Sequence, residues 1–434
     1  MKKTINQIKP PESAAAYIDR LVGRRVKNGL DNIRRLLPPE TDGTGAAIIH
    51  VTGTNGKGSI CAFLASVYRA AGYRVGVFSS PHLVEVRERF RINGEMMAEA
   101  DFEDLVARLR IRCEAIEQTA QTRFGFFEFL LAVAMTWFHE QAVDIILLEV
   151  GIGGRFDATN YIRRPAAAVI GTISLDHENI LGTTVAEVAG QKAGIVKAGA
   201  PVIYLSTSAE ADEIIRAEAK RLSAPGHCVL PPTEADIRLD GHSLRCRVGR
   251  RELRLPTIAR YQAANAAVAL RTISVLQERL PVDEEQLING IAAFSWPGRM
   301  EEVHDGIYVD GSHNPEGVRA LIDSVRYLNG KKILLFGVVN DKKYDTMIQE
   351  LTVGDLFSEI HLVTLRTARK TQTEILAEIF RRYSTVPVYR YASVSEALEK
   401  LLGSHRFGES AELLICAGSL YLVGEIKEYI DDKF

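Results

Sequence analysis

Runs of consecutive apolar residues, each about as long as a β-strand, alternate with helical patterns along most of the chain. In the first half these runs span residues 46–53, 73–80, 143–151, 166–174 and 201–206. Their hydrophobicity is continuous rather than alternating, which is typical of strands covered on both faces. Because helical patterns separate them, the sequence predicts an α/β fold with a mainly parallel sheet.

The pattern changes between residues 226 and 256 to shorter alternating stretches such as HSLRCRVGRRELRLP. Alternation indicates strands with one exposed face, so we expect a small antiparallel sheet attached to the same domain. Helical patterns follow at 260–276 and then to about residue 294.

The segment WPG at 296–298 ends the last of these helices, and we place the domain boundary there. A first domain of residues 1–297 is therefore followed by a second of residues 298–434. In the second domain the strand and helix rhythm restarts, which predicts a Rossmann-like unit. Its apolar runs span 331–339, 359–365, 386–391 and 411–419.

Composition and charge narrow the possible functions. Lys plus Arg (53) nearly balances Asp plus Glu (55), so no net field favours nucleic acid or an anionic membrane as a partner. The five cysteines are scattered without a CxxC pair, which fits a reducing compartment. No signal-peptide core or stretch of transmembrane length is apparent. We expect a cytoplasmic protein that binds neither nucleic acid nor membrane.

The segment GTNGKGS at 53–59 lies between the first apolar run and a helical pattern. Strand, glycine-rich turn and helix start form the geometry in which backbone N–H groups surround a phosphate. The glycines allow close approach of an anion, and Lys57 supplies a cation to the outer phosphates of ATP. Val51 and Gly58 depart from a full Walker A motif, but the flanking strand and helix disfavour a merely flexible turn. The expected nucleotide contacts are Thr54, Asn55, Gly56, Lys57, Gly58 and Ser59.

Glu149 lies at the carboxyl end of the run at 143–151, where ligands gather in open parallel sheets. A carboxylate there suits a hard divalent cation that bridges phosphates. The alternative is a helix cap or a surface acid, which the apolar surroundings disfavour.

Several further segments occur together with this loop, in order and over about residues 12–430. They are SSPHL (79–83), ERFRING (88–94), FFE (126–128), EVGIGGRFDATN (149–160), SLDHENILG (174–182), QKAGIVK (191–197), WPGRM (296–300), DGSHNP (310–315) and AGSLYLVGEI (417–426). Together they resemble the folylpolyglutamate synthase and dihydrofolate synthase family, the folate branch of the Mur ligase superfamily.

This resemblance implies a monomeric ligase that joins L-glutamate to a folate or to dihydropteroate through an acyl phosphate, using ATP and Mg²⁺. It also implies a P-loop domain of the Mur-ligase type with a folate-side N-terminal segment, and a C-terminal domain on the glutamate side.

The resemblance assigns magnesium to Ser80, Glu149 and His177, and a carbamate on Lys192 that helps a second magnesium. His177 alone is a weak candidate, because Mg²⁺ prefers oxygen ligands. Gln191 stands where relatives have a glutamate, so carbamylation remains a hypothesis. The implied catalytic residues are Lys57, His177, Lys192 and Arg299.

Asn265, Arg299 and Asp310 match positions that contact adenine, phosphate and ribose in the family. Arg299 directly follows the domain boundary, so domain closure would bring its cation to the γ-phosphate. Many relatives read GxHQ before the asparagine helix, whereas this chain has ARYQ at 259–262, which leaves adenine contacts from that turn open.

On the pterin side the resemblance points to two stretches, and to a glutamate site on the second domain. Phe126 and Phe127 can stack on a flat heterocycle, or simply pack in the core. The implied substrate contacts are Ser80, Gly125 (a threonine in relatives), Phe126, Phe127, Glu128, Phe156, Asp157 and Ala158, with His313 and Ser419 for glutamate.

Two rival functions remain open. A Mur-type ligase acting on another carboxylate would need a uridine-nucleotide site in the N-terminal segment, which instead reads YIDRL and NGLDNIRRLL. A non-catalytic ATP-binding switch would bind nucleotide without glutamate-dependent turnover. The sequence does not distinguish dihydropteroate from reduced folates as substrate.

Overall fold

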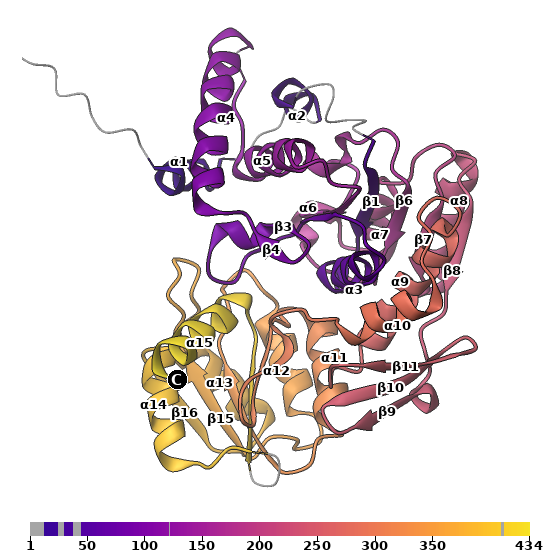
Figure 1. Cartoon of the computed structure of the whole chain (residues 1–434). Helices are drawn as coiled ribbons and strands as arrows, with labels where there is room; N and C mark the ends of the chain where they lie inside the picture. Colours follow the sequence, from indigo (N-terminus) through magenta and orange to yellow (C-terminus); the bar gives the residue numbers. More distant parts are fainter. Residues whose placement is uncertain (1–12, 25–29, 38–44, 121, 409–411) are drawn as a thin grey trace, which may run out of the picture.

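Two α/β units, each built on its own mainly parallel sheet, make up the molecule (Figure 1). The structure is a computed structural model and describes residues 13–24, 30–37, 45–120, 122–408 and 412–434. In Figure 1 the N-terminal unit lies above the C-terminal unit, and a small three-stranded sheet lies beside the latter. Within the described residues, no helix is long and apolar enough to cross a membrane.

The N-terminal unit contains an eight-stranded sheet in the order β4-β3-β2-β5-β1-β6-β7-β8. In this order, each pair of neighbours from β2 onwards is parallel. At the other end of the sheet, β3 and β4 add an antiparallel edge. The continuous apolar runs form its central strands, as predicted. The strands are β1 (Ala47–Thr52), β2 (Val75–Phe78), β3 (Phe90–Ile92), β4 (Glu95–Met96), β5 (Ile145–Glu149), β6 (Ala167–Ile170), β7 (Val202–Leu205) and β8 (Gly226–Val229).

Helices cover both faces of this sheet. On one face α3, α9 and α10 pack against the odd-numbered residues of β1, such as Ile49 and Val51. On the other face α1, α2, α4 and α5 pack near Ile48, and α7 and α8 lie under β6 and β7. The helices are α1 (Ala14–Leu21), α2 (Asp31–Leu36), α3 (Lys57–Ala70), α4 (Glu99–Ala120), α5 (Phe126–Glu140), α6 (Glu178–Leu181), α7 (Val185–Ala193), α8 (Ala209–Arg221), α9 (Gln262–Leu276) and α10 (Glu284–Ala292), with the 3₁₀ helices η2 (Val86–Arg89), η3 (Ala158–Tyr161) and η4 (Glu234–Asp236).

The antiparallel sheet consists of β9 (Ile237–Asp240), β10 (Ser243–Val248) and β11 (Arg251–Leu255). It confirms the expectation from the alternating pattern, but it begins later than predicted. Residues 226–229 form β8, which pairs in parallel with β7. This start of the segment was therefore assigned wrongly: the crossover through α8 returns the chain in the direction of β7, which gives a parallel neighbour.

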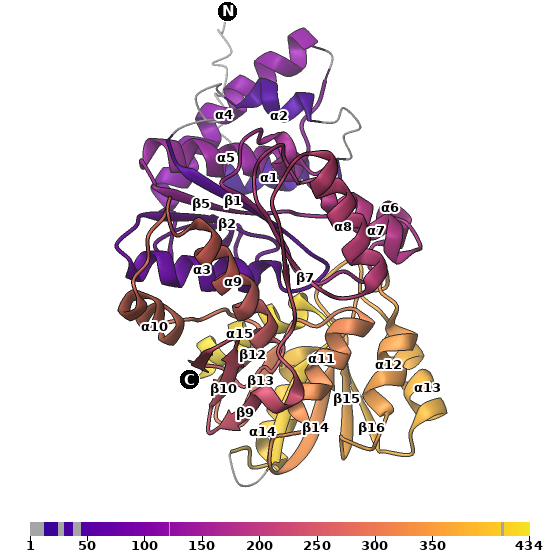
Figure 2. The ribbon, with the colours of Figure 1, turned by 90° about the vertical axis from the view of Figure 1, so that its right-hand side faces the viewer.

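The C-terminal unit has a six-stranded sheet in the order β12-β13-β17-β14-β15-β16, with β12 antiparallel at one edge. Figure 2 shows α11, α12 and α13 on one side of this sheet and α14 and α15 on the other. The elements are β12 (Arg299–His304), β13 (Ile307–Asp310), α11 (Pro315–Val325), β14 (Lys331–Phe336), α12 (Tyr344–Thr352), β15 (Glu359–Val363), α13 (Thr373–Tyr383), β16 (Val388–Tyr391), α14 (Val394–Ser404), β17 (Glu412–Ala417) and α15 (Leu420–Lys433).

Candidate functional site

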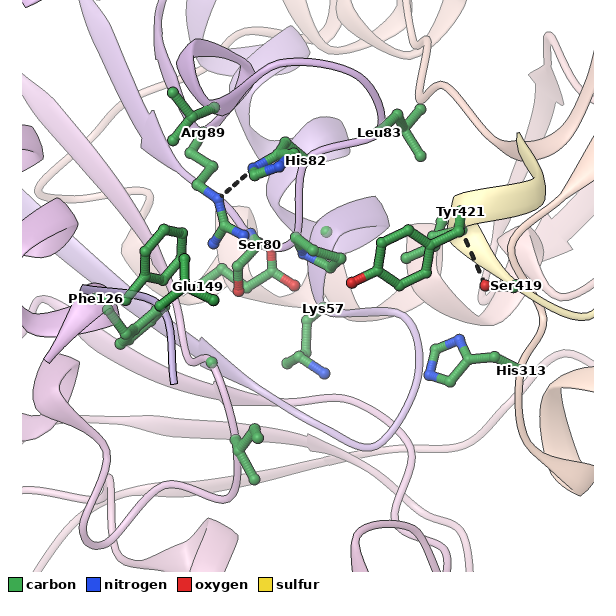
Figure 3. Close-up of a pocket in the computed structure, with 18 of the residues that line it drawn as sticks. Lys57, Ser80, His82, Leu83, Arg89, Phe126, Glu149, His313, Ser419 and Tyr421 are labelled. Carbon is green, nitrogen blue, oxygen red and sulfur yellow. Dashed lines mark hydrogen bonds between the residues drawn. The ribbon is translucent and has the colours of Figure 1, made fainter. Parts of the chain in front are cut away.

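A cavity of about 1270 Å³ lies between the two units, at the carboxyl ends of β1, β2 and β5. Its walls come from the loop after β1, the loop after β2, the end of β5 and residues of the C-terminal unit such as His313 and Ser419. Figure 3 shows side chains from both units converging on it, with Lys57 and Glu149 near the middle. Open parallel sheets bind ligands at this edge.

The loop after β1 has the predicted strand, turn and helix geometry. Gly56, with φ of 84°, is the residue before α3, and no side chain of the described residues caps that helix. The first N–H groups of α3 therefore remain available to an anion. The ammonium of Lys57 donates hydrogen bonds to the carbonyl oxygens of Gly53 (3.0 Å) and Thr54 (3.1 Å). An anion bound in the loop would replace these two carbonyl oxygens as the partner of the Lys57 ammonium.

Two glycines of the loop lie against neighbouring elements too closely for any side chain. A Cβ at Gly58 would lie 2.6 Å from Cζ2 of Trp296, at the junction between the units. A Cβ at Gly56 would collide with the side-chain oxygen of Asn265 on α9. The loop is thus packed between α9 and the junction.

Asn265 is buried and does not line the cavity. Its Nδ2 donates to Oε1 of Gln262 (2.8 Å), whose Nε2 donates to Oγ of Ser59 (3.1 Å). The asparagine helix therefore contacts the phosphate loop through a short chain of hydrogen bonds.

Glu149 is a buried carboxylate at the end of β5. Its Oε2 accepts a hydrogen bond from the backbone N–H of Ser80 (3.1 Å). Burial raises the pKa of this carboxyl, while the charges of Lys57, Arg299 and Arg89 favour its ionised form. Several cations thus lie near this buried carboxylate.

The residues present fit a magnesium ion. In the part of the chain that the structure describes, no three His, Cys, Asp or Glu side chains are grouped so that they could hold a metal ion. Mg²⁺ is usually bound by one or two carboxylates together with phosphate oxygens and water, rather than by a full protein cage. The adjacent Ser80 and Glu149 offer oxygen ligands of this kind. His177 lines the same cavity and precedes α6 with a φ of 51°.

Lys192, in the last turn of α7, is buried and lines the cavity. Burial lowers the pKa of this ammonium well below its ordinary value, and the charge of Lys57 lowers it further. Asp176 and Glu316 oppose this shift. The neutral amine is thereby favoured, and it is the form that reacts with carbon dioxide.

The predicted pterin-side residues divide between the cavity wall and its support. Phe126 and Phe127 line the cavity. Gly125 precedes α5, and its N–H donates to Oε2 of Glu128 (2.9 Å), so this carboxylate helps to start the helix. The ring of Phe127 also packs against Phe78, with ring centroids 5.5 Å apart.

The second predicted stretch behaves in the same way. Asp157 lines the cavity, whereas Phe156 is 72% exposed and Ala158 packs against the core. The carboxylate of Asp157 accepts from the N–H of Ile152 (3.0 Å) and from the N–H and hydroxyl of Thr159 (3.0 and 2.6 Å). Burial raises the pKa of Asp157.

His50 lies behind this carboxylate and carries no functional prediction from the sequence, because it is part of an apolar run. Its Nε2 lies 2.8 Å from the hydroxyl of Thr159, which in turn donates to Asp157. Because the Thr159 hydroxyl donates its proton to Asp157, its oxygen can only accept from His50. Nε2 of His50 is therefore protonated and donates to Thr159. Nδ1 has no partner among the described residues, and burial lowers the pKa of His50 to about 3.

We expect His50 to make the protein sensitive to acid. Its folded pKa is depressed, so below about pH 6.5 the unfolded chain binds a proton that the folded chain does not. The free energy of unfolding then falls as the pH falls toward about 3, by up to about 1.4 kcal/mol per pH unit. His50→Gln keeps a donor for Thr159 and does not titrate, so its unfolding free energy, measured in urea at several pH values, should fall less steeply. Equal slopes would contradict this assignment.

Arg89 and His82 are further residues of the cavity wall that have no predicted role. Nε of Arg89 donates to Nδ1 of His82 (2.9 Å), and burial lowers the pKa of Arg89 to about 10. The guanidinium carbon lies 5.3 Å from the ring centroid of Phe126, and Figure 3 shows it between this ring and Glu149. Arg89 belongs to the motif ERFRING, which contributed to the family resemblance but led to no predicted role for this arginine.

The C-terminal unit contributes His313 and Ser419 to the opposite wall. Nδ1 of His313 lies 2.8 Å from the carbonyl oxygen of Gly311, and burial lowers the pKa of this ring to about 3. The ring is therefore neutral, with the proton on Nδ1. Ser419 precedes α15, and its Oγ accepts from the N–H of Tyr421 (3.1 Å).

Asp310 is buried and does not line the cavity. Its carboxylate accepts from the hydroxyl of Tyr261 (2.6 Å) and from the N–H groups of Met300 (3.0 Å) and Ser312 (2.8 Å). Arg299 pairs with Asp310 in the β12–β13 register and does line the cavity.

The structure thus brings most of the predicted site residues to one cavity. Those that line it are Thr54, Asn55, Gly56, Lys57, Gly58, Ser59, Ser80, Phe126, Phe127, Glu149, Asp157, His177, Lys192, Arg299, His313 and Ser419. Those that do not are Gly125, Glu128, Phe156, Ala158, Asn265 and Asp310.

Comparisons with known proteins place this geometry in context. Residues 298–420 match the family described as "Mur ligase, glutamate ligase domain". The chain is 33% identical, over 434 residues, to the dihydrofolate synthase/folylpolyglutamate synthase of Bacillus subtilis (strain 168), covering 96% of this chain and 98% of that one. It is 30% identical to the folylpolyglutamate synthase of Lacticaseibacillus casei, covering 88% and 89%.

Solved structures agree in fold. FolC from E. coli in complex with ADP superposes with a TM-score of 0.82 at 27% identity, covering 98% of both chains. The folylpolyglutamate synthase of Mycobacterium tuberculosis, complexed with ADP and AMPPCP, has a TM-score of 0.83 at 25% identity, covering 96% of this chain and 98% of that one.

Proposed function

Because this chain belongs to the dihydrofolate synthase and folylpolyglutamate synthase family, we propose that it is an ATP-dependent ligase that joins L-glutamate to a folate, to dihydropteroate, or to both. The observation that carries the proposal is the cavity between the units. It combines a phosphate loop and a buried acid from one unit with polar residues from the other. The boundary between residues 297 and 298 is part of the proposal, as is a monomer in the cytoplasm.

ATP is assigned to the loop after β1. The uncapped start of α3 and the nearby ammonium of Lys57 supply N–H donors and a cation to its phosphates. Asn265 and Asp310 remain the proposed contacts of adenine and ribose, although neither lines the cavity in this structure. Arg299 lines the cavity from the C-terminal unit and is the second cation proposed for the phosphates.

Magnesium is assigned to Ser80, Glu149 and His177. When bound, it neutralises charge on the phosphate oxygens. Lys192, whose pKa is lowered by burial, is the proposed site of a carbamate. The carbamate would place an anion at the end of this side chain. These assignments rest on the family resemblance and on the oxygen ligands that Glu149 and Ser80 offer.

The substrates are assigned to opposite ends of the cavity. Phe126 and Phe127 offer ring faces to the pterin, and Asp157 offers a fixed hydrogen-bond acceptor. Gly125, Glu128, Phe156 and Ala158 belong to the same two stretches and would support these contacts. L-glutamate is assigned to His313 and Ser419 on the C-terminal unit.

The reaction then proceeds in two steps. An oxygen of the substrate carboxylate attacks the γ-phosphorus, and ADP leaves. The neutral amine of glutamate attacks the acyl carbon of the resulting acyl phosphate, inorganic phosphate leaves, and the nitrogen loses a proton. Lys57 and Arg299 stabilise the charge on the transferring phosphoryl group. The enclosed position between the units protects the acyl phosphate from water.

We expect glutamate-dependent ADP release with dihydropteroate, with tetrahydrofolate, or with both. The measurement is ADP release with each acceptor in turn, with and without L-glutamate, together with detection of the amide product. ATP binding without glutamate-dependent turnover would instead indicate a nucleotide switch. Turnover that requires a different carboxylate would indicate another ligase of the Mur type.

A further inference from the structure

The side chain of Asn55, in the middle of the phosphate loop, is held by the C-terminal unit. Its Nδ2 donates to Oε2 of Glu316 (2.6 Å) and lies 3.3 Å from Oδ1 of Asn314. In return, Nδ2 of Asn314 donates to Oδ1 of Asn55 (3.0 Å). Residues separated by about 260 positions in the sequence thus satisfy each other's hydrogen bonds at the nucleotide loop.

Glu316 contacts further residues of the N-terminal unit besides Asn55. The same Oε2 accepts from the hydroxyl of Ser174 (2.6 Å) and from that of Thr172 (3.3 Å), in the loop after β6. Thr172 also accepts from the backbone N–H of Asn55 (3.1 Å). One carboxylate oxygen therefore joins two loops of the N-terminal unit to the C-terminal unit.

Glu316 lies at the capped start of a helix. It lies in the first turn of α11, and the preceding Asn314 accepts from the N–H of Gly317 (2.8 Å) and so caps the helix. The start of a helix also interacts favourably with the negative charge of a carboxylate. Bonds from an amide or hydroxyl to an ionised carboxylate are stronger than neutral ones. Glu316 can therefore hold the loop in place rather than merely follow it.

We propose that Glu316 is a positioning residue that acts through Asn55, and couples the conformation of the phosphate loop to the placement of the C-terminal unit. This inference rests on the proposed function. The loop holds the phosphates, whereas the C-terminal unit holds the glutamate amine. The contact keeps the acyl phosphate and the amine in register, so that the intermediate is captured by glutamate before water reaches it.

Another polar contact between the units provides a matched control. Lys343, just before α12, forms an ion pair with Glu178, and its side chain is 54% exposed. This pair bridges the same two units, and within the described residues it forms no hydrogen bond or ion pair with the phosphate loop. An exposed ion pair of this kind contributes little to the stability of the protein. Lys343→Ala therefore tests whether loss of any bridging contact has the same effect.

The first experiment compares wild type, Glu316→Gln, Glu316→Ala and Lys343→Ala by the amount of ADP formed per amide product. In Glu316→Ala we expect ADP in excess of product and a KM for glutamate raised roughly 10-fold or more, the scale of a misplaced reactant. Nucleotide affinity should change less, within about 3-fold, because the phosphate contacts remain. Glu316→Gln, whose amide oxygen still accepts, should lie between. Lys343→Ala should match the wild type.

A double variant checks that the effect passes through Asn55. If it does, Asn55→Ala combined with Glu316→Ala should lose no more coupling than the more damaged single variant. Additive losses, an unchanged ratio of ADP to product in Glu316→Ala, or an equal loss in Lys343→Ala would each overturn the proposal.

An independent readout separates this proposal from the proposed function. Spin labels on α8 and α13, placed after the exposed Cys228 is replaced by serine, report the distance between the units by pulsed electron spin resonance. With ATP analogue bound, the wild type should show a narrow distance distribution and Glu316→Ala a broader one, whether or not the enzyme turns over the chosen acceptor. Identical distributions would refute the role of Glu316 even in an active ligase.

Discussion

Lys57→Ala is expected to remove glutamate-dependent ADP release while leaving a folded protein. The ammonium is the cation that the phosphate loop offers to the transferring phosphoryl group, and no other residue of the loop carries a positive charge. Loss of one donor to a charged transition state lowers turnover by roughly 100- to 1000-fold. The measurement is steady-state ADP release at saturating ATP and acceptor.

The fold should tolerate this change. Among the described residues, the ammonium donates hydrogen bonds to two carbonyl oxygens of its own loop, those of Gly53 and Thr54, and burial lowers its pKa. Removing a cation that burial disfavours should leave the thermal unfolding midpoint near that of the wild type. A folded variant with wild-type turnover would refute the assignment of the loop to ATP.

Lys192→Ala should cause the second large loss, and it tests the carbamate. The amine of Lys192 has a strongly lowered pKa because it is buried close to Lys57. In the carbamylated protein the nitrogen of the neutral amine bonds the carbon of carbon dioxide and releases one proton, so that an uncharged group becomes an anion beside the phosphates. Loss of that anion should lower turnover by roughly 100-fold or more, on the scale of other fixed charges in active sites.

Two measurements distinguish a carbamate from a plain lysine. Activity of the wild type should rise with added bicarbonate, and small carboxylates such as acetate should partly restore Lys192→Ala, because they supply the missing anion. Lys192→Arg keeps the positive charge and should not be restored. The carbamylation hypothesis is abandoned if mass measurement under native conditions finds no carbon dioxide on the site and bicarbonate has no effect.

The parts of the fold that could be predicted from sequence are those set by local patterns. Continuous apolar runs identified β1, β2, β5, β6 and β7 of the first sheet and β14 to β17 of the second, because strands buried on both faces are apolar along most of their length. The strands β3, β4, β12 and β13, which form antiparallel pairs at the edges of the two sheets, lay outside these runs and were not predicted. The run at Gly226–Val229 was assigned wrongly because its residues are partly exposed, as at an edge strand, so its pattern did not reveal its parallel partner. Strand pairing depends on the path of the chain between the strands as well as on the strand itself.

The phosphate loop was also determined by sequence alone. Gly53 to Ser59 follow one another directly, and a turn with positive φ at Gly56 is a local property of the backbone. Glu149 could likewise be identified as a candidate site residue from the sequence, because it ends a buried strand and ligands bind at the carboxyl ends of such strands.

Only the tertiary structure decided which distant side chains became partners. The hydrogen bonds of Asn55 with Glu316, of His50 with Thr159 and of Arg89 with His82 join residues that no local pattern connects. The same holds for Asp310, whose carboxylate is occupied by Tyr261 and two backbone N–H groups rather than facing the cavity. A sequence shows which groups can form hydrogen bonds, whereas the packing of the two units decides which of them meet and which remain open to a ligand.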